Sequence, residues 1–486
     1  MSDCDFARYT TRSGRVYSAC QQVMFTALQL PAMILAAMKA EAAQDDAFES
    51  EAQFMTEAAQ DDAFESEVQK CNYTPLSVDP TPSCVPEPPS PLPFATPAST
   101  PDSEGSSSSR KRKRPSGKPL NRHIRAMKRE DRYDKHGHIP VPRKLEKLVE
   151  KACVEDAGID LRELPSTMGG YEAKREDEWE AKVYTLAEAK ALGLQVYEWD
   201  GRRPVAFVAP NKQIFMVLAG RPDDPQYDSA TERVYEALSA KGVKFTSKYL
   251  HHRRGDYPTL DIGVSRGQGL PQPVSLKCQP HEKFVANLLA NPDIQRMASY
   301  ASSAFATWAP RTYNYYKTQL DKLFMRMPGL PRIFTKSIFP SMSTNISPQA
   351  QTVRHRDLKN CPFGWCAVQA FGHFDPKQGG HLILWELGLA IEFPPGSTIL
   401  LPSATLSHSN TKILDDEERA SLTYYCHGGL FRWVEYDFQI EKDLKHNNPA
   451  LFNQIWRDRP ARWNLGLSLF STMDELQGGQ FEQCEV

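Results

Sequence analysis

The sequence predicts an α+β fold, with helices first and short strands afterwards. Residues 282–289 and 299–325 have helical periodicity, with a break near Pro310. Beyond Pro328, short apolar runs are separated by Gly and Pro at intervals of roughly 8 to 12 residues, which is typical of a sandwich, barrel or jelly roll. Because helices and strands are segregated along the chain, the α+β class is favoured.

The first 109 of the 486 residues differ in composition from the rest. They include 16 acidic and 5 basic residues, and from residue 71 onward they are rich in Pro, Ser and Thr. The segment EAAQDDAFESE occurs at 41–51 and again at 57–67. Two copies are too few for a solenoid, so we expect a largely disordered tail. The repeat is either an interaction segment or a local duplication.

A basic segment, residues 110–139, follows this tail. It opens with RKRKR, from Arg110 to Arg114. Such a run is typical of a nuclear-localisation signal that binds an import receptor, or of a nucleic-acid contact, and a solvated charge run is the alternative. The apolar stretch from Val23 to Met38 resembles a targeting segment but is short for a membrane span. We therefore expect a nuclear protein without a membrane span, with secretion as the alternative.

Residues 140–486 have the composition of one folded domain. Helices are expected at 143–157, 185–192 and 228–241, and a β-hairpin at 205–218. The strands expected after Pro328 are 333–339, 365–371, 382–385, 389–393, 398–401, 422–426 and 431–434.

The segment KFTSKYLHHRRGDYP, residues 244–258, mixes cationic and aromatic side chains. Such a mixture suits phosphate contact and base stacking. Because basic runs are common on surfaces, an ordinary surface loop is the favoured interpretation.

Three residues could bind one metal ion. His355 and Asp357 are two apart, so on an extended backbone their side chains leave the same side. His408 follows after an apolar, turn-punctuated run that predicts neighbouring strands. Two histidines and one carboxylate with open coordination positions form the facial triad of non-haem Fe(II) oxygenases. A second HxD pair, His373 and Asp375, enters a Gly-rich turn and is the weaker candidate.

Arg419 and Ser421 follow His408 closely, and their spacing places both on one face of a strand. A guanidinium and a hydroxyl suit a carboxylate, here the distal carboxylate of 2-oxoglutarate.

Four segments, HRDLKN, GGHLILW, PPGSTILLPSATLSHSN and ERASLTYYCHGGLFRW, resemble the TET/JBP family of Fe(II)- and 2-oxoglutarate-dependent nucleic-acid dioxygenases, especially its compact fungal-type members. The likeness is most specific from His355 to Trp433 and does not include the first 140 or so residues. The ten cysteines include no CxxC pair, so the cysteine-rich zinc module of the larger members has no counterpart.

This resemblance implies a double-stranded β-helix and a set of site residues. The implied ligands of Fe(II) are His355, Asp357 and His408. The implied contacts to 2-oxoglutarate are Arg419, Ser421 and His381, and for His381 a structural strand residue is the alternative. The implied contacts to a flipped base are Asn360, Tyr425 and His427.

The resemblance therefore implies a DNA 5-methylcytosine dioxygenase that uses Fe(II), 2-oxoglutarate and O2. Oxidation would give hydroxymethylcytosine and, on further turnover, formyl- and carboxylcytosine. An oxygenase that acts on N6-methyladenine or methylated RNA is one alternative, and a catalytically inactive chromatin-binding protein is another. The sequence leaves the oligomeric state open.

Overall fold

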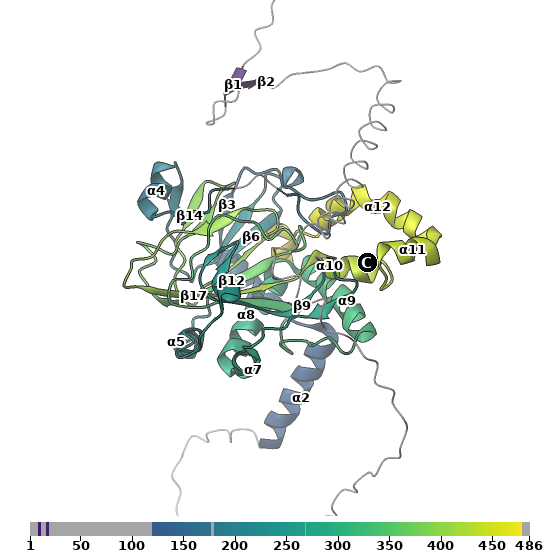
Figure 1. Cartoon of the computed structure of the whole chain (residues 1–486), viewed down its shortest axis with the longest axis horizontal. Helices are drawn as coiled ribbons and strands as arrows, with labels where there is room; N and C mark the ends of the chain where they lie inside the picture. Colours follow the sequence, from purple (N-terminus) through teal and green to yellow (C-terminus); the bar gives the residue numbers. More distant parts are fainter. Residues whose placement is uncertain (1–7, 11–15, 19–118, 176–178, 268, 479–486) are drawn as a thin grey trace, which may run out of the picture. The chain divides into compact units, whose positions relative to one another are not determined.

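A computed structural model describes residues 8–10, 16–18, 119–175, 179–267 and 269–478 (Figure 1). The chain divides into two compact units, residues 1–111 and 112–486. In the first unit, β1 (Arg8–Thr10) pairs with β2 (Val16–Ser18) in an antiparallel hairpin. The acidic repeat, the stretch from Val23 to Met38 and the RKRKR run lie outside the described residues.

A nine-stranded mixed sheet forms the centre of the second unit. Its strand order is β10-β9-β11-β17-β12-β15-β6-β5-β3, and β3 pairs in parallel with β5 whereas the other pairs are antiparallel. The strands are β3 (Cys153–Asp156), β5 (Val205–Val208), β6 (Ile214–Gly220), β9 (Thr259–Ser265), β10 (Val274–Ser275), β11 (Ser341–Asn345), β12 (Cys366–His373), β15 (Thr398–Leu401) and β17 (Glu418–Tyr425). The expected hairpin at 205–218 is confirmed as β5 and β6.

A second, four-stranded sheet has the order β16-β13-β14-β4. Its strands are β4 (Gln195–Tyr197), β13 (Leu382–Leu384), β14 (Leu389–Ile391) and β16 (His408–Asn410). A small hairpin joins β7 (His251–His252) to β8 (Gly255–Asp256) within the predicted basic loop. The second unit is thus a mixed α+β structure with two main sheets.

One face of the large sheet is polar where β9, β11 and β17 lie side by side. Ser343 of β11 pairs with Asp261 of β9 and with Thr423 of β17, and Asn345 pairs with Ser421. Directly paired residues point to the same face of a sheet. The alternate residues of β17, such as Leu422 and Tyr424, are fully buried on the opposite face. This polar face forms one wall of the site described below.

Helices cover the apolar face of the large sheet. Figure 1 shows α5 and α8 beside β12, and both helices contact that strand. Phe305 of α8 is fully buried and its ring contacts four other aromatic side chains, those of Tyr313, Tyr316, Phe339 and Trp365. These rings form the centre of the hydrophobic core.

The remaining helices surround the sheets. The α-helices are α2 (Pro119–His136), α3 (Pro142–Lys151), α4 (Leu186–Ala191), α5 (Pro225–Leu238), α6 (Ser247–Leu250), α7 (Glu282–Ala290), α8 (Pro292–Trp308), α9 (Pro310–Arg326), α10 (Gly428–Glu435), α11 (Glu441–Asn447), α12 (Pro449–Ser468) and α13 (Met473–Gly478), and Leu161–Glu163 is a 3-10 helix. No described helix is both long and apolar enough to cross a membrane.

Several expectations about the elements are wrong. Helices do not come before strands along the chain, because β3 to β10 precede α7 to α9. These early strands belong to the two main sheets and to the small hairpin. The helix expected at 143–157 ends at Lys151, since the chain continues into β3. The strand expected at 431–434 is part of α10, where Leu430, Phe431 and Val434 are buried at helical spacing. Residues 333–339 form no strand, and their apolar side chains pack on the core directly.

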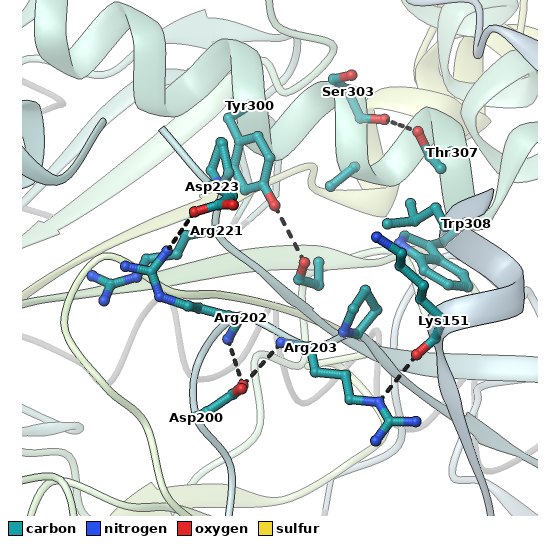
Figure 2. Close-up of a pocket in the computed structure, with 15 residues that line it drawn as sticks. Lys151, Asp200, Arg202, Arg203, Arg221, Asp223, Tyr300, Ser303, Thr307 and Trp308 are labelled. Carbon is teal, nitrogen blue, oxygen red and sulfur yellow. Dashed lines mark hydrogen bonds and ion pairs between the residues drawn. The ribbon is translucent and has the colours of Figure 1, made fainter. Parts of the chain in front are cut away.

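A cavity of about 780 Å³ lies between α8, α3, the end of β6 and the turn before β5 (Figure 2). Trp308 and Tyr300 contribute aromatic walls, and Tyr300 donates a hydrogen bond to the carbonyl of Ala219. Arg202 lies beside Asp223 at the rim. The lining of this cavity shares no residue with the candidate metal centre described below.

Replacing Phe305 with Ala should lower the free energy of unfolding by about 3–5 kcal/mol, because the change leaves a cavity among four aromatic rings. Urea unfolding followed by circular dichroism measures this loss. Met325→Ala is the matched control, since 81% of Met325 is exposed on α9. A loss as small as that of the control would contradict the assigned core.

Candidate metal centre

Backbone hydrogen bonds bring the predicted metal ligands together. The N–H of His355 donates to the carbonyl of His408 at 3.0 Å, and the N–H of His408 donates back to His355 at 2.9 Å. The N–H of Asp357 donates to the carbonyl of Ser403 at 2.9 Å. A loop and strand β16, separated by 53 residues in sequence, are thereby fixed side by side.

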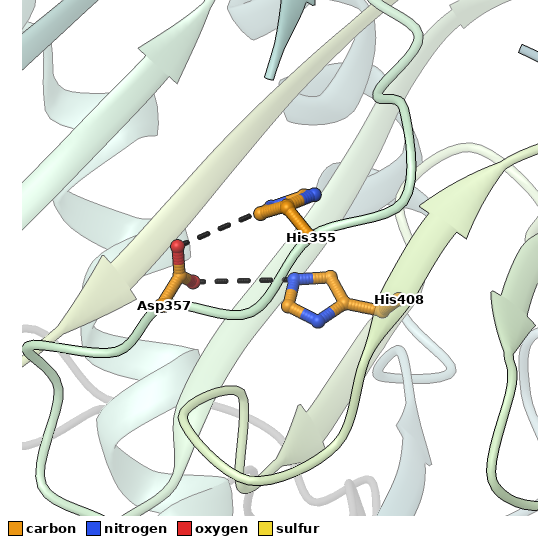
Figure 3. A group of neighbouring side chains, drawn as sticks. All are labelled: His355, Asp357 and His408. Atoms are coloured by element: carbon orange, nitrogen blue, oxygen red, sulfur yellow. Dashed lines mark ion pairs between the residues drawn. The ribbon is translucent and has the colours of Figure 1, made fainter. Parts of the chain in front are cut away.

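The ligand atoms of His355, Asp357 and His408 all lie within 4.8 Å of one another (Figure 3). Each histidine Nε2 is 3.9 Å from a carboxylate oxygen of Asp357. The two Nδ1 atoms face the carbonyls of Val353, at 2.8 Å, and Leu406, at 3.0 Å. An Nδ1–H that donates to a carbonyl leaves Nε2 with its lone pair, which is the atom that a metal binds.

The electrostatics of the three residues favour their ligand forms. Burial and the neighbouring His408 lower the pKa of His355 well below its usual value. Burial acts to raise the pKa of Asp357, but the neighbouring histidines and Arg253 together hold it below its usual value. A neutral imidazole and an ionised carboxylate are the forms that bind divalent metals.

Arg419 is a buried cation on the same wall. Its Nη1 donates to the carbonyl of Ala350, whereas its Nε has no hydrogen-bond partner among the described residues. Burial lowers the pKa of Arg419 to about 10. Ser421, two residues along β17, accepts a hydrogen bond from Asn345 Nδ2 at 2.9 Å. A buried guanidinium without an acidic partner in the described part of the chain suits an anionic ligand.

Two further buried polar atoms have no hydrogen-bond partner in the part of the chain that the structure describes. The Tyr257 hydroxyl has none among the described residues, and burial raises the pKa of Tyr257 to about 12 against the opposing charges of Arg254 and Arg419. His381 is fully buried, its Nδ1 lies 3.1 Å from the Thr411 hydroxyl, and its Nε2 has no partner in the described ranges. Burial lowers the pKa of His381 to about 4. Tyr257 was not predicted as a neighbour of Arg419, because no sequence spacing links the two residues.

The three residues predicted to contact a base lie close together. Asn360 and His427 form an antiparallel backbone bridge, and Asn360 Nδ2 donates to the Ser403 hydroxyl at 3.0 Å. The rings of Tyr425 and His427 have centroids 5.1 Å apart. His427 Nδ1 is 2.8 Å from the Ser265 hydroxyl, and burial lowers the pKa of His427 to about 4. Its imidazole is therefore neutral at pH 7.

Part of the predicted basic loop reaches the centre. Arg253 Nη1 donates to the carbonyl of Arg356, and Arg253 Nη2 lies 3.4 Å from the Asp357 carboxylate. Arg254 is largely buried and lies 3.4 Å from the carboxylate of Asp261. Arg253 is 61% exposed, as expected for a surface loop, whereas the largely buried side chain of Arg254 does not fit that interpretation. Asp261 was also not predicted as a site residue, although a single acidic residue in the apolar run TLDIGVS can be recognised in the sequence.

The second HxD pair does not join the centre. His373 Nε2 lies 2.8 Å from the carboxylate of Glu232, and Asp375 accepts a hydrogen bond from the backbone N–H of Lys377 in a turn. Neither residue is part of the metal-type cluster found within the described ranges.

No protein-family model matches the sequence, and no curated protein is similar to it. The chain resembles the solved structure of NgTET1 in complex with 5mC DNA, at 15% identity and a TM-score of 0.36, over 50% of this chain and 88% of that one. It also resembles an oxidoreductase of the 2OG-Fe(II) oxygenase family from Burkholderia pseudomallei, at 16% identity and a TM-score of 0.24, over 40% of this chain and 76% of that one. A dioxygenase for auxin oxidation in rice has 13% identity and a TM-score of 0.23, over 57% of this chain and 83% of that one. Because these TM-scores are low, the assignment of the centre rests on its own geometry.

Proposed function

We propose that this chain is an Fe(II)- and 2-oxoglutarate-dependent dioxygenase. The observation that supports this most directly is the cluster of two Nε2 atoms and one carboxylate within 4.8 Å. Two histidines and one carboxylate are the ligand set of non-haem Fe(II) oxygenases, and they leave coordination positions open. When bound, iron with 2-oxoglutarate and O2 supplies the oxidising power, and 2-oxoglutarate is converted to succinate and CO2.

The residues beside the cluster suit 2-oxoglutarate. The cosubstrate is a dicarboxylate, and Arg419 offers a buried guanidinium whose Nε has no partner among the described residues. Ser421 and the orphaned Tyr257 hydroxyl can add hydrogen bonds, and His381 offers a buried Nε2. A carboxylate bound here would form an ion pair with the buried guanidinium of Arg419. This pairing would offset the cost of keeping that charge out of water.

The architecture that we propose is a double-stranded β-helix formed by the two main sheets. Its metal ligands would stand between the polar face of β9, β11 and β17 and strand β16 of the smaller sheet. Residues 140–486 would be the catalytic domain, residues 110–139 a basic linker and residues 1–109 an acidic tail. The run from Arg110 to Arg114 would direct the protein to the nucleus.

The substrate that we propose is 5-methylcytosine in DNA. A methyl group inside a stacked duplex cannot reach a buried metal, so the base must be flipped, at a cost of a few kcal/mol. Tyr425 can stack on the flipped base, and Asn360 and the neutral His427 can hydrogen-bond its polar edge. Oxidation would give hydroxymethylcytosine and, on further turnover, formyl- and carboxylcytosine.

His355→Ala should weaken Mn(II) binding, used as a redox-stable substitute for Fe(II), by more than about 100-fold, since even outer-shell partners of metal ligands contribute 10- to 100-fold. Isothermal titration calorimetry measures this affinity. The matched control is His373→Ala, which removes the histidine of the second HxD pair and should bind Mn(II) like the wild type. Equal affinity in His355→Ala and the wild type would contradict the metal assignment.

Arg419→Met should raise the KM for 2-oxoglutarate at least about 30-fold, because the carboxylate loses a charge-assisted hydrogen bond worth about 2 kcal/mol or more. Without ligand, its free energy of unfolding should stay within about 1 kcal/mol of the wild type or rise, because a buried unpaired charge is removed. Succinate formation and urea unfolding are the two measurements. Arg457→Gln, on the exposed side of α12, is the control. An unchanged KM in Arg419→Met would refute this role.

Incubation of the full chain with Fe(II), 2-oxoglutarate and a methylated duplex should give oxidised cytosine, detected by mass spectrometry of the digested DNA. Parallel reactions contain N6-methyladenine duplex or methylated RNA, and oxidation confined to one of these would replace the proposed substrate. Absence of any oxidised base, beside an active control enzyme, would contradict the proposal. Succinate release that is lost in His355→Ala would exclude a catalytically inactive chromatin-binding protein.

A further inference from the structure

Asp261 is an acidic side chain on the polar wall of the site, and neither the metal nor the cosubstrate assignment uses it. It lies in the middle of β9 between Leu260 and Ile262, which are buried, and 46% of its own side chain is exposed. Charged residues are uncommon in strands, and the carboxylate of Asp261 is the single acidic group in the run TLDIGVS.

The strand register points Asp261 toward the proposed base site. Asp261 pairs with Ser343, and Ser343 pairs with Thr423. Tyr425 follows Thr423 by two residues on β17, so all four side chains project from one face of the sheet. The negative charge of Asp261 also opposes the burial that lowers the pKa of His427. Its carboxylate is therefore near both members of the Tyr425 and His427 pair.

The carboxylate of Asp261 is fixed at one oxygen and open at the other. Oδ1 accepts a hydrogen bond from the Ser343 hydroxyl and lies 3.4 Å from Arg254 Nη2. Oδ2 has no hydrogen-bond partner among the residues that the structure describes. On a side chain that is 46% exposed, a carboxylate that two neighbours orient at one oxygen can accept a hydrogen bond from a ligand at the other.

A 5-methylcytosine oxidase that acts on DNA must reject thymine, because both bases carry a methyl group at C5. They differ at C4, where cytosine has an amino group and thymine a carbonyl. Asn360 can donate or accept through its amide, and the neutral His427 has one donor and one acceptor nitrogen. These two groups can therefore adapt to either base. A carboxylate only accepts, so it binds the amino group and repels the carbonyl.

We propose that Asp261 binds the exocyclic amino group of the flipped base and thereby selects 5-methylcytosine against thymine. This inference rests on the proposed function and adds a specificity-determining residue to it. Ser343 and Arg254 act as positioning residues that hold the carboxylate in place. An amide at position 261 would keep the shape of the side chain, but it could turn its NH2 toward the carbonyl of thymine.

Asp261→Asn tests this directly. The full-length wild type and variant are given two duplexes that differ at one position, 5-methylcytosine paired with G or thymine paired with A. Mass spectrometry measures hydroxymethylcytosine and hydroxymethyluracil. The variant should oxidise 5-methylcytosine about 10- to 100-fold more slowly, as expected for a lost hydrogen bond to a charged group. Its preference for 5-methylcytosine over thymine should fall at least tenfold.

Two further variants separate base reading from a structural effect. Asp256→Asn, whose carboxylate on β8 is 82% exposed and faces His251, should leave the preference unchanged. Ser343→Ala keeps the charge of Asp261 but removes the hydrogen bond that orients its carboxylate. It should therefore reduce the preference for 5-methylcytosine over thymine by a smaller factor than Asp261→Asn does.

If the wild type oxidises 5-methylcytosine and Asp261→Asn keeps the wild-type preference, the role of Asp261 is wrong while the proposed function stands. If the wild type oxidises neither base, the proposed function is contradicted, and this inference with it. A general loss of folding in Asp261→Asn, seen as a lowered unfolding midpoint with an unchanged preference, would also overturn the inference.

Discussion

The paired backbone hydrogen bonds between His355 and His408 are the constraint on which the site depends. These bonds connect the loop between β11 and β12 of the large sheet with the edge strand β16 of the smaller sheet, at the predicted ligand residues themselves. Because both Nδ1 atoms are occupied by nearby carbonyls, the two imidazoles cannot rotate freely. Two Nε2 atoms are thereby aimed at the carboxylate of Asp357 before any ligand binds.

The alternation of polar and apolar side chains along β17 links this centre to the rest of the fold. Leu422 and Tyr424 anchor the strand in the core, while Arg419, Ser421 and Tyr425 project into the site. The helices on the far face therefore hold these polar side chains indirectly, by fixing the strand that carries them. The apolar half of the strand stabilises the fold, and the polar half includes the buried guanidinium of Arg419, whose Nε has no hydrogen-bond partner among the described residues.

The cluster of possible metal ligands could be anticipated from the sequence, because His355 and Asp357 are two residues apart and a distant histidine follows a run of predicted strands. Periodicity also located α8, α9 and the hairpin of β5 and β6. It failed for α10, because a short apolar run fits a buried strand or a buried helix equally well. Asp261 could not be assigned in advance, since its proximity to Tyr425 comes from the pairing of β9, β11 and β17, and Tyr257, in the turn before β9, is likewise far from Arg419 in sequence.

The central claim, that His355, Asp357 and His408 hold Fe(II), is tested most directly by anomalous diffraction at the iron edge. Crystals would be grown without oxygen in the presence of Fe(II) and 2-oxoglutarate. We expect a single strong anomalous peak between the two Nε2 atoms and the Asp357 carboxylate, with 2-oxoglutarate density leading from it to Arg419. The absence of a peak there, or a peak at other residues, would contradict the account.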